Sequence, residues 1–574
     1  LKLIQNQLMN ESSGANINEN TQHSKSLIKE LFYPDTPHQK SLRRTLISIL
    51  DKPEFSKPEY FKSLQEERDF TMKTTRLLIS ELNLTDNFTL RHIREDLSLF
   101  SVLADIANFY HPAILTKLIA GVSLFYNSVK NLGTRKHEKY LDRVLNCTDV
   151  GSFGLTEFSH GSNVRGLQTT AVFNKTKRTF LINSNGKQNY KWWIAGAAEE
   201  ANISVIFARL IVDEKDYGIN PFLVPIRKSI RGETINKKVV LGEIGLKLGM
   251  NGVDNGYIGF SDYELEYDMM LDRYCQINEN GNFVSNIVDS NYRFATMLGA
   301  LEEGRTILPV NVPQTLLKTD LVAIKYAMER KQFSSGSKRG VEEESPIINY
   351  QLVNQRVVTA LAEACAYRSL GFECLFSWNS ILNKLSKADD PHVKYVHALL
   401  SVSKPLITSR TQTRLQDLRE VLGGNGYSVS SGIGIFRNDN DVNCTWEGDN
   451  NVLYQQCGKF ILANLLQYQK SLVKEPHKKH NRKLEYNIFA EFIGDCKELN
   501  LDKQCSETLY SALKEYNDSS RFKGLRTGLD IERNDSPFVH KIVKDGEILS
   551  SILTQRFISR VFLLSQEQDI KELL

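Results

Sequence analysis

Cysteine is scarce in this chain, and an excess of either charge is absent. The eight cysteines form no C-x-x-C pair and no Cys/His cluster at zinc-binding spacing. That distribution excludes a disulfide framework and a structural metal, and it is typical of reduced thiols in an intracellular protein. The chain has 72 Lys and Arg residues and 68 Asp and Glu residues, so its net charge is only +4. Charge therefore favours neither nucleic acid nor a membrane surface as a partner.

Long apolar runs are also absent. The nearest one, LIAGVSLFYNSV (118–129), is too short to span a bilayer, so we expect it to be a buried helix and expect no membrane span. The composition is otherwise that of an ordinary globular protein, with 41% hydrophobic and 24% charged residues. A chain of 574 residues exceeds what a single core can hold, which predicts about three or four domains.

The period of the apolar residues changes twice along the chain. Helical spacing in LSLFSVLADIANF (97–109) gives way to TTAVFNKTKRTFLIN (169–183), which is typical of a β-hairpin. The β-branched run ISVIFARLIV (203–212) predicts a buried strand. Helical spacing then returns over long stretches such as QLVNQRVVTALAEACAYRSLGFECLF (351–376), which favours a helical bundle.

These changes predict an α+β multidomain protein with helical domains on both sides of a central, β-barrel-like domain. The predicted parts are a flexible N-terminal arm (1–25), an N-terminal helical domain (26–149), a β-domain (150–288), a helical bundle (289–470) and a second C-terminal helical domain (484–574). The basic stretch KEPHKKHNRK (474–483) is interpreted as the linker before the last domain.

Two motifs in the β-domain suggest a ligand site, each with an ordinary alternative. GLTEFSHGSNVRGLQTTA (154–171) gathers glycines and hydroxyls that could hydrogen-bond a phosphate or a ring, or could simply form a Gly/Ser turn. A single loop histidine such as His160 is more often structural than catalytic. KWWIAGAAEEA (191–201) could place an apolar wall beside a ring, although a core anchor is the favoured interpretation of the paired tryptophans.

Three further motifs lie in the predicted bundle. ERKQF (329–333) falls inside a predicted long helix, where Arg330 and Phe333 would share a face and the arginine could pair with a pyrophosphate or stay on the surface. GGNGY (423–427) permits close approach to a phosphate, or ends a helix. In CTWEGDNNVL (444–453), burial beside Trp446 would raise the pKa of Glu447 and make it a base, whereas a solvated loop acid is the commoner case.

In their order and spacing, these motifs resemble the acyl-CoA oxidase family, flavoenzymes of peroxisomal β-oxidation related to the acyl-CoA dehydrogenases. The resemblance runs from about residue 90 to 465 and includes NLGTRKHEKYL (131–141), IGLKLGMNGVDNGYIGF (244–260) and PIINYQLVNQRV (346–357). The family's flavin loop, TE-x-x-HG-[ST]-x-x-x-G-x-x-TTA, is matched at Thr156, Glu157, His160, Gly161, Ser162, Gly166, Thr169, Thr170 and Ala171.

The resemblance implies FAD as the cofactor, Glu447 as the catalytic base and no metal site. The cofactor-binding residues that it implies are Thr156, Gly161, Ser162, Ala195, Gly196, Arg330, Phe333, Gly423 and Gly424. Arg330, Phe333 and the Gly423–Gly424 turn would reach the flavin of a neighbouring subunit, which implies a homodimer. Two positions depart from the pattern. Ala195 stands where the family usually has glycine. The dehydrogenases have a glutamine before their GG turn, and this chain has Glu420 near that position.

The activity that the resemblance implies is oxidation of fatty acyl-CoA to trans-2-enoyl-CoA, with O₂ reduced to H₂O₂. One alternative is an acyl-CoA dehydrogenase that passes electrons to a flavoprotein, although dehydrogenases usually end with the bundle. Another is a catalytically silent CoA-binding or scaffold protein. A peroxisomal location is expected from the resemblance alone, since the chain ends in IKELL and not in S-K-L.

Overall fold

A computed structural model describes residues 34–58, 60–299, 302–333, 344–382, 390–458 and 460. The predicted arm at 1–25 and the helical domain predicted at 484–574 lie outside these residues. The described chain forms two compact units, one within Leu1–Ala388 and Ile407–Glu447 and the other within Asp389–Leu406 and Gly448–Glu572.

The first unit opens with a series of helices, of which α3 to α7 begin at side-chain caps. They are α3 (Pro37–Leu50), α4 (Leu64–Asn83), α5 (Leu90–Glu95), α6 (Leu97–Tyr110), α7 (Pro112–Lys117), α8 (Phe125–Leu132) and α9 (Lys139–Leu145), with the π-helical segment η2 (Leu118–Leu124) joining α7 to α8. Thr36 and Gln39 form reciprocal bonds at the start of α3, and the Asp96 carboxylate accepts from the Ser98 N–H at 2.8 Å at the start of α6. These caps satisfy backbone donors that have no partner within the helix.

The continuous helix Pro112–Leu132 is long and apolar enough, by length and composition, to cross a membrane. The expectation that no segment reaches that length is therefore wrong, because α7 continues into η2 without a break and extends the helix on the N-terminal side of the predicted run. However, 72% of the apolar window is buried inside the protein, which confirms the interpretation of 118–129 as a buried helix. It forms part of one core with side chains such as Phe100 and Val205.

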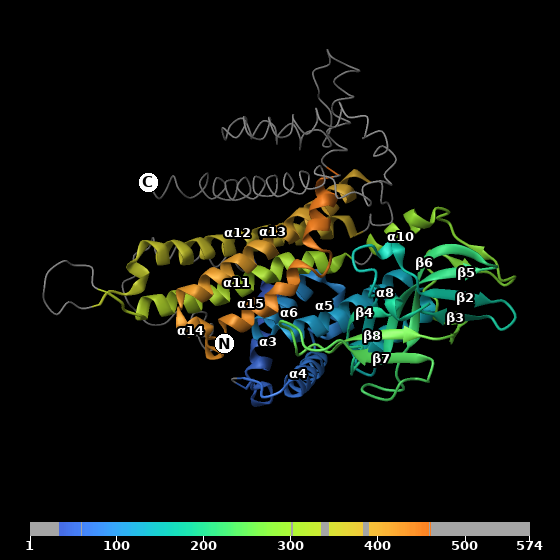
Figure 1. The fold of residues 1–574 in the computed structure, drawn as a ribbon, viewed down its shortest axis with the longest axis horizontal. Helices are drawn as coiled ribbons and strands as arrows, with labels where there is room; N and C mark the ends of the chain where they lie inside the picture. Colours follow the sequence, from blue (N-terminus) through green and yellow to red (C-terminus); the bar gives the residue numbers. More distant parts are fainter. Residues whose placement is uncertain are drawn as a thin grey trace, which may run out of the picture. The chain divides into compact units, whose positions relative to one another are not determined.

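The middle of this unit is built from strands, drawn from teal to green in Figure 1. They are β1 (Gly151–Gly154), β2 (Thr170–Asn174), β3 (Thr179–Asn183), β4 (Lys191–Ala195), β5 (Ile203–Val212), β6 (Lys215–Pro225), β7 (Val239–Glu243), β8 (Asn255–Phe260), β9 (Tyr263–Glu266), β10 (Gln276–Ile277) and β11 (Phe283–Val284). A six-stranded sheet has the order β1-β5-β2-β3-β9, with β6 also pairing with β5, and a three-stranded sheet has the order β4-β8-β7. The antiparallel β2–β3 pair confirms the predicted hairpin, and β5 confirms the predicted buried strand.

Long helices follow the strands. They are α10 (Ser290–Gly299), α11 (Glu303–Glu329), α12 (Gln351–Ile381), α13 (Pro391–Val421), α14 (Gly424–Tyr427) and α15 (Ile433–Asp441). Leu316 of α11, Val357 of α12 and Leu415 of α13 are buried in one cluster, so these helices pack together within the first unit. The predicted order of helical, β and helical regions is therefore confirmed.

The prediction that ERKQF lies inside a helix is wrong. Helix α11 ends at Glu329, and Arg330 has the extended backbone angles φ −73° and ψ 119°. The chain then runs beside the segment before α12, where the Ile347 N–H donates to the Arg330 carbonyl at 2.8 Å and the Ser345 N–H donates to the Phe333 carbonyl at 2.7 Å. These bonds replace the helical ones, so Arg330 and Phe333 do not share a helix face.

The second unit contains residues 391–406 of α13 and the helical residues that begin at 450. Val402, Tyr454 and Cys457 form its apolar cluster. Lys404 is fully buried there, and its ammonium donates to the Gly448 carbonyl at 2.7 Å and to the Asn450 side chain at 2.8 Å. These hydrogen bonds offset the cost of burying a charge.

Candidate active site

Thr156, the first residue of the predicted flavin loop, is tied to the start of β4. Its hydroxyl donates to the Trp192 carbonyl at 2.8 Å, and its own carbonyl accepts from the Trp192 N–H at 3.0 Å. A threonine hydroxyl has one donor and two acceptor positions. Because the donor is used by Trp192, the half-buried Thr156 oxygen is left as an acceptor toward a ligand.

The same loop folds around the buried carboxylate of Glu157. That carboxylate accepts from the Gln168 N–H at 2.9 Å, from the Thr169 N–H at 2.9 Å and hydroxyl at 2.6 Å, and from the Lys191 ammonium at 3.2 Å. His160 Nδ1 also lies 3.1 Å from it, which supports the structural interpretation of this histidine. Burial alone would raise the pKa of Glu157. The charge of Lys191 and the hydrogen bonds from Thr169 and Gln168 together have the larger effect, so the pKa lies below its usual value. Burial lowers the pKa of Lys191 to about 8.

The two tryptophans of β4 have different surroundings. The Trp192 ring stacks on Tyr257 at 5.3 Å between centroids, and Phe158 packs edge-on against it at 4.8 Å. Trp193 is 60% exposed and has a φ of 66°. The core-anchor interpretation is therefore wrong for Trp193, because the left-handed backbone turns its indole outward. Trp193 instead presents an exposed aromatic ring, one residue after the backbone partner of Thr156.

Strand β4 ends at Ala195, and the chain turns at Gly196. The Gly196 N–H donates to the Asp254 carbonyl at 3.0 Å, and its carbonyl accepts from the Ala201 N–H at 2.8 Å, so both backbone polar groups have protein partners. Gly196 has a φ of 84°, where glycine is favoured. Ala195 packs with Trp446 against the cluster of Ala113, Met250 and Val253. The structure thus brings the end of β4 next to the loop that carries Glu447.

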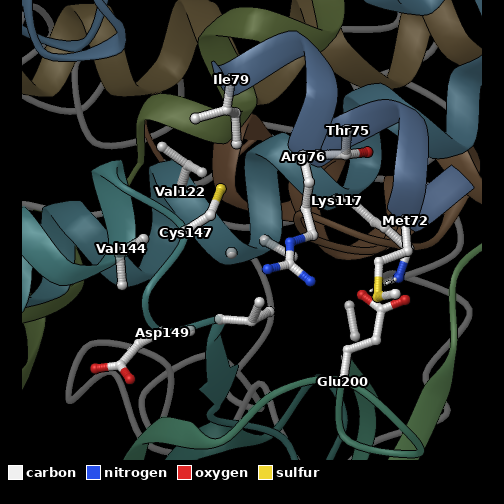
Figure 2. A pocket seen from close by; sticks show the side chains of 16 residues that line it. Met72, Thr75, Arg76, Ile79, Lys117, Val122, Val144, Cys147, Asp149 and Glu200 are labelled. Carbon is white, nitrogen blue, oxygen red and sulfur yellow. Dashed lines mark ion pairs between the residues drawn. The ribbon is translucent and has the colours of Figure 1, made fainter. Parts of the chain in front are cut away.

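A cavity adjoins this turn and is lined by α4, by η2 and by residues near β1 (Figure 2). Lys117 and Glu200 form an ion pair at its wall, with 2.7 Å between Nζ and Oε2, and the Arg76 guanidinium extends between this pair and Cys147. Burial lowers the pKa of Lys117, but Asp254 and Glu200 raise it by more. Lys117 therefore carries its charge at neutral pH.

The other predicted cofactor residues are exposed. Gly161 and Ser162 lie on the surface of the flavin loop, and a Cβ added at Gly161 would meet nothing within 4 Å. Gly423 and Gly424 are exposed where α13 gives way to α14, and Gly423 has a φ of 56°. Arg330 is exposed as well. Phe333 is 76% exposed with a φ of 54°.

Glu420, the residue that departs from the dehydrogenase pattern, is engaged on the surface of α13. Its carboxylate accepts from the Gln416 amide at 2.8 Å and lies 3.4 Å from the Arg356 guanidinium. These contacts are all within the first unit, and they show that the acidic side chain has partners in its own subunit.

Glu447 is half-buried and has a φ of 54°, an unusual conformation for a residue with a side chain. Such strain gathers at functional sites, where the surrounding structure enforces it. Next to it, the Trp446 indole N–H donates to the Asn443 side chain at 2.8 Å, which fixes the ring beside the acid. Arg305 donates through Nε to the Glu447 carbonyl at 3.0 Å.

Sequence reasoning missed the first turn of α11. A Cβ built on Gly304 would lie 2.5 Å from the Glu447 carboxyl carbon, so this buried glycine touches the predicted base. In the sequence, this turn is part of LEEGRTIL (301–308), in which a glycine stands between a glutamate and an arginine. Nothing in that local pattern points to Glu447, because the contact joins segments far apart in the chain. Among the described residues, no cluster of three or more His, Cys, Asp or Glu could hold a metal ion.

Comparison with known proteins finds two family models within the chain. The family described as "Acyl-CoA dehydrogenase, middle domain" matches residues 152–263, and "Acyl-CoA oxidase, C-alpha1 domain" matches residues 298–462. Acyl-coenzyme A oxidase 2, peroxisomal, of Arabidopsis thaliana is 34% identical over 387 residues, which are 66% of this chain and 54% of that protein. Human peroxisomal acyl-coenzyme A oxidase 3 is 32% identical over 63% of this chain and 52% of its own length.

The fold is also shared with solved structures. Acyl-CoA oxidase-1 of Caenorhabditis elegans, solved in complex with FAD and ATP, has a TM-score of 0.75 at 19% identity, covering 98% of this chain and 82% of that one. The chain has helical regions on both sides of a β-domain, and it matches these families. It is therefore a member of the acyl-CoA dehydrogenase superfamily. Within that superfamily, the chain belongs to the acyl-CoA oxidase family. It spans about half the length of the two relatives described above.

Proposed function

We propose that this protein is an FAD-dependent acyl-CoA oxidase. It would remove a proton from the α-carbon and a hydride from the β-carbon of a fatty acyl-CoA to give the trans-2-enoyl-CoA. The proton and the hydride together reduce O₂ to H₂O₂, so the reaction takes no net proton from solvent. The substrates are fatty acyl-CoA and O₂, and the likeness to peroxisomal relatives supports a peroxisomal location.

The observation that carries this proposal is the setting of Glu447. The α-hydrogen of a thioester is a weak acid, so its removal needs a carboxylate held in place and shielded from water. Glu447 is half-buried beside Trp446, and its backbone is held in a left-handed conformation by Arg305. A solvated loop acid would have no need of such restraint.

The loop that carries Thr156 and the start of β4 offer groups that suit a planar ring. The exposed Trp193 indole offers an apolar face, the Thr156 oxygen offers an acceptor, and Gly161 has open space beside it. FAD bound here would supply the hydride acceptor that no side chain can provide. Thr156, Gly161, Ser162 and the backbone at Ala195 would hold it, while the partners of the Gly196 N–H and carbonyl leave that residue a role in shaping the turn.

A homodimer is part of the proposal. Arg330, Phe333, Gly423 and Gly424 are all exposed, and Phe333 and Tyr427 present aromatic rings to solvent at 76% and 85% exposure. Large exposed aromatic side chains favour an interface, and a guanidinium suits a pyrophosphate. These residues would complete the flavin site of a neighbouring subunit.

The test is turnover of a series of fatty acyl-CoAs by the purified protein, with H₂O₂ and enoyl-CoA both measured. Glu447→Gln keeps the shape of the side chain and removes the base, so it should retain FAD while the rate falls by about 10²–10⁴. A colourless protein without flavin would instead favour the silent CoA-binding alternative. A Glu447→Gln variant that keeps most of the rate would contradict the base assignment.

A further inference from the structure

The backbone at Glu447 is held by the first turn of α11. The Arg305 guanidinium makes two contacts at once: Nε donates to the Glu447 carbonyl at 3.0 Å, and Nη1 lies 2.9 Å from a Glu302 carboxylate oxygen. The second contact fixes the guanidinium on its own helix. The first therefore ties the strained peptide at Glu447, with its φ of 54°, to α11.

The side chain of Glu447 rests on Gly304. A Cβ at position 304 would lie 2.5 Å from the carboxyl carbon and from Oε1, and 2.7 Å from Oε2. Those distances are too short for any side chain, so glycine is required for the carboxylate to occupy its place. The atoms that would collide are the far end of a flexible side chain, so an alanine there displaces the carboxylate and leaves the backbone intact.

Glu303 anchors this turn to the N-terminal helices. Its carboxylate accepts from both terminal nitrogens of Arg94 at 2.8 and 3.2 Å, from the Ser123 hydroxyl at 2.9 Å and from the Asn127 amide at 2.7 Å. Arg94 is buried and its guanidinium also lies 4.2 Å from the centroid of the Phe100 ring. Donors from α5, η2 and α8 thus converge on one side chain of α11, which fixes the turn.

We propose that this turn, Glu302–Arg305, positions the Glu447 carboxylate for proton abstraction. Gly304 contacts the carboxylate and leaves room for it, Arg305 hydrogen-bonds the Glu447 carbonyl, and Glu303 binds the turn to the N-terminal helices. These are positioning residues, since each acts on the substrate only through Glu447. The inference rests on the proposed function, because it takes Glu447 to be the base.

The experiment isolates proton abstraction from hydride transfer. An acyl-CoA whose β-carbon carries no hydrogen, such as phenylacetyl-CoA, cannot be oxidised, but its α-hydrogens remain acidic. In D₂O the Glu447 carboxylate takes an α-proton, exchanges it with solvent and returns a deuteron, so deuterium in the thioester reports the base alone. The FAD-loaded protein is used, and mass spectrometry measures the exchange rate.

Gly304→Ala should slow this exchange by roughly tenfold to a hundredfold, since a displacement of about 1 Å is costly for a catalytic group. Its FAD content and Tm should match those of the parent. Gly434→Ala is the matched control, because a Cβ at this α15 position meets nothing within 4 Å, and it should exchange as the parent does. Arg305→Lys, which removes the Nε donor and keeps the charge, is the second variant and should also slow exchange with FAD retained.

The outcomes separate this inference from the proposed function. Exchange at the parental rate in both Gly304→Ala and Arg305→Lys, with none in Glu447→Gln, would overturn the positioning role alone. Parental exchange in Glu447→Gln would overturn the base assignment itself. In turnover of an oxidisable acyl-CoA, adding Gly304→Ala to Glu447→Gln should cost nothing further, because residues that act through one group are not additive. A further loss in the double variant would indicate a general structural role instead.

Discussion

Lys191 and Glu157 form an ion pair whose two side chains are fully buried, with 3.2 Å between Nζ and Oε1. The pair joins the first strand residue of β4 to the loop that carries Thr156. A charge pair in such a place persists only because backbone and hydroxyl donors complete it, here from Gln168 and Thr169. The predicted flavin loop therefore has a buried polar cluster of its own.

Lys191→Met should be strongly destabilising. It leaves the Glu157 carboxylate buried without its cation, which costs about 3–5 kcal/mol of unfolding free energy for a broken buried pair. FAD content should fall with it, because the Thr156 loop loses its anchor. Urea unfolding monitored by fluorescence measures the loss. Lys228→Met, at the exposed Lys228–Glu233 pair, is the control and should leave the midpoint unchanged; an equal effect in both would contradict the assignment.

Asp320 should make the protein less stable as the pH rises. This buried side chain of α11 has no hydrogen-bond partner among the described residues, and burial raises its pKa to about 8. The unfolded carboxyl loses its proton near pH ~4, so between pH ~4 and ~8 the folded state holds a proton that the unfolded state does not. The contribution of Asp320 to folding is therefore present below that window and is lost as the pH rises through it.

Asp320→Asn removes this titration. The unfolding free energy of the variant relative to the parent should increase from about pH 5.5 to about pH 8, by up to ~1.4 kcal/mol per pH unit. Denaturant unfolding at both pH values measures the difference. Any fixed cost of the amide is the same at each pH, so a constant difference would show that Asp320 does not titrate as described.

Arg330→Ala tests the proposed dimer. If Arg330 completes the flavin site of the neighbouring subunit, the variant should lose FAD and dissociate more readily at the same time. Sedimentation velocity with flavin absorbance follows both properties. Arg135→Ala, at another exposed arginine, should change neither. A fully active parent monomer that holds FAD would exclude the shared site.

The elements that the sequence predicts correctly depend on near neighbours. The hairpin at 169–183 and the strand at 203–212 follow from alternation and β-branched composition, and both occur as β2–β3 and β5. The end of α11 does not follow in this way. The residues ERKQF suit a helix, but the peptide groups of Arg330 and Phe333 pair with residues 345–347, and a contact across the chain overrides local propensity.

The residues of the candidate site also differ in whether the sequence alone indicates them. The order of its motifs indicates Thr156 and Glu447, since family resemblance depends on short runs of sequence. The sequence does not indicate Lys191 and Gly304, which contact Glu157 and Glu447. Their roles depend on burial and on contacts with residues far away in the chain. Lys191 precedes two tryptophans that are more conspicuous, and a glycine in LEEGRTIL resembles any other small helical residue.

The proposed function requires that electrons taken from an acyl-CoA pass to O₂. The most direct measurement is flavin absorbance after mixing the purified protein with a fatty acyl-CoA, first without oxygen and then after air is admitted. We expect the absorbance to bleach without oxygen and to return within seconds in air, with one H₂O₂ formed per enoyl-CoA. Absorbance that stays bleached in air for many minutes, and returns only with an electron-transfer protein or a dye, would contradict the oxidase and support a dehydrogenase.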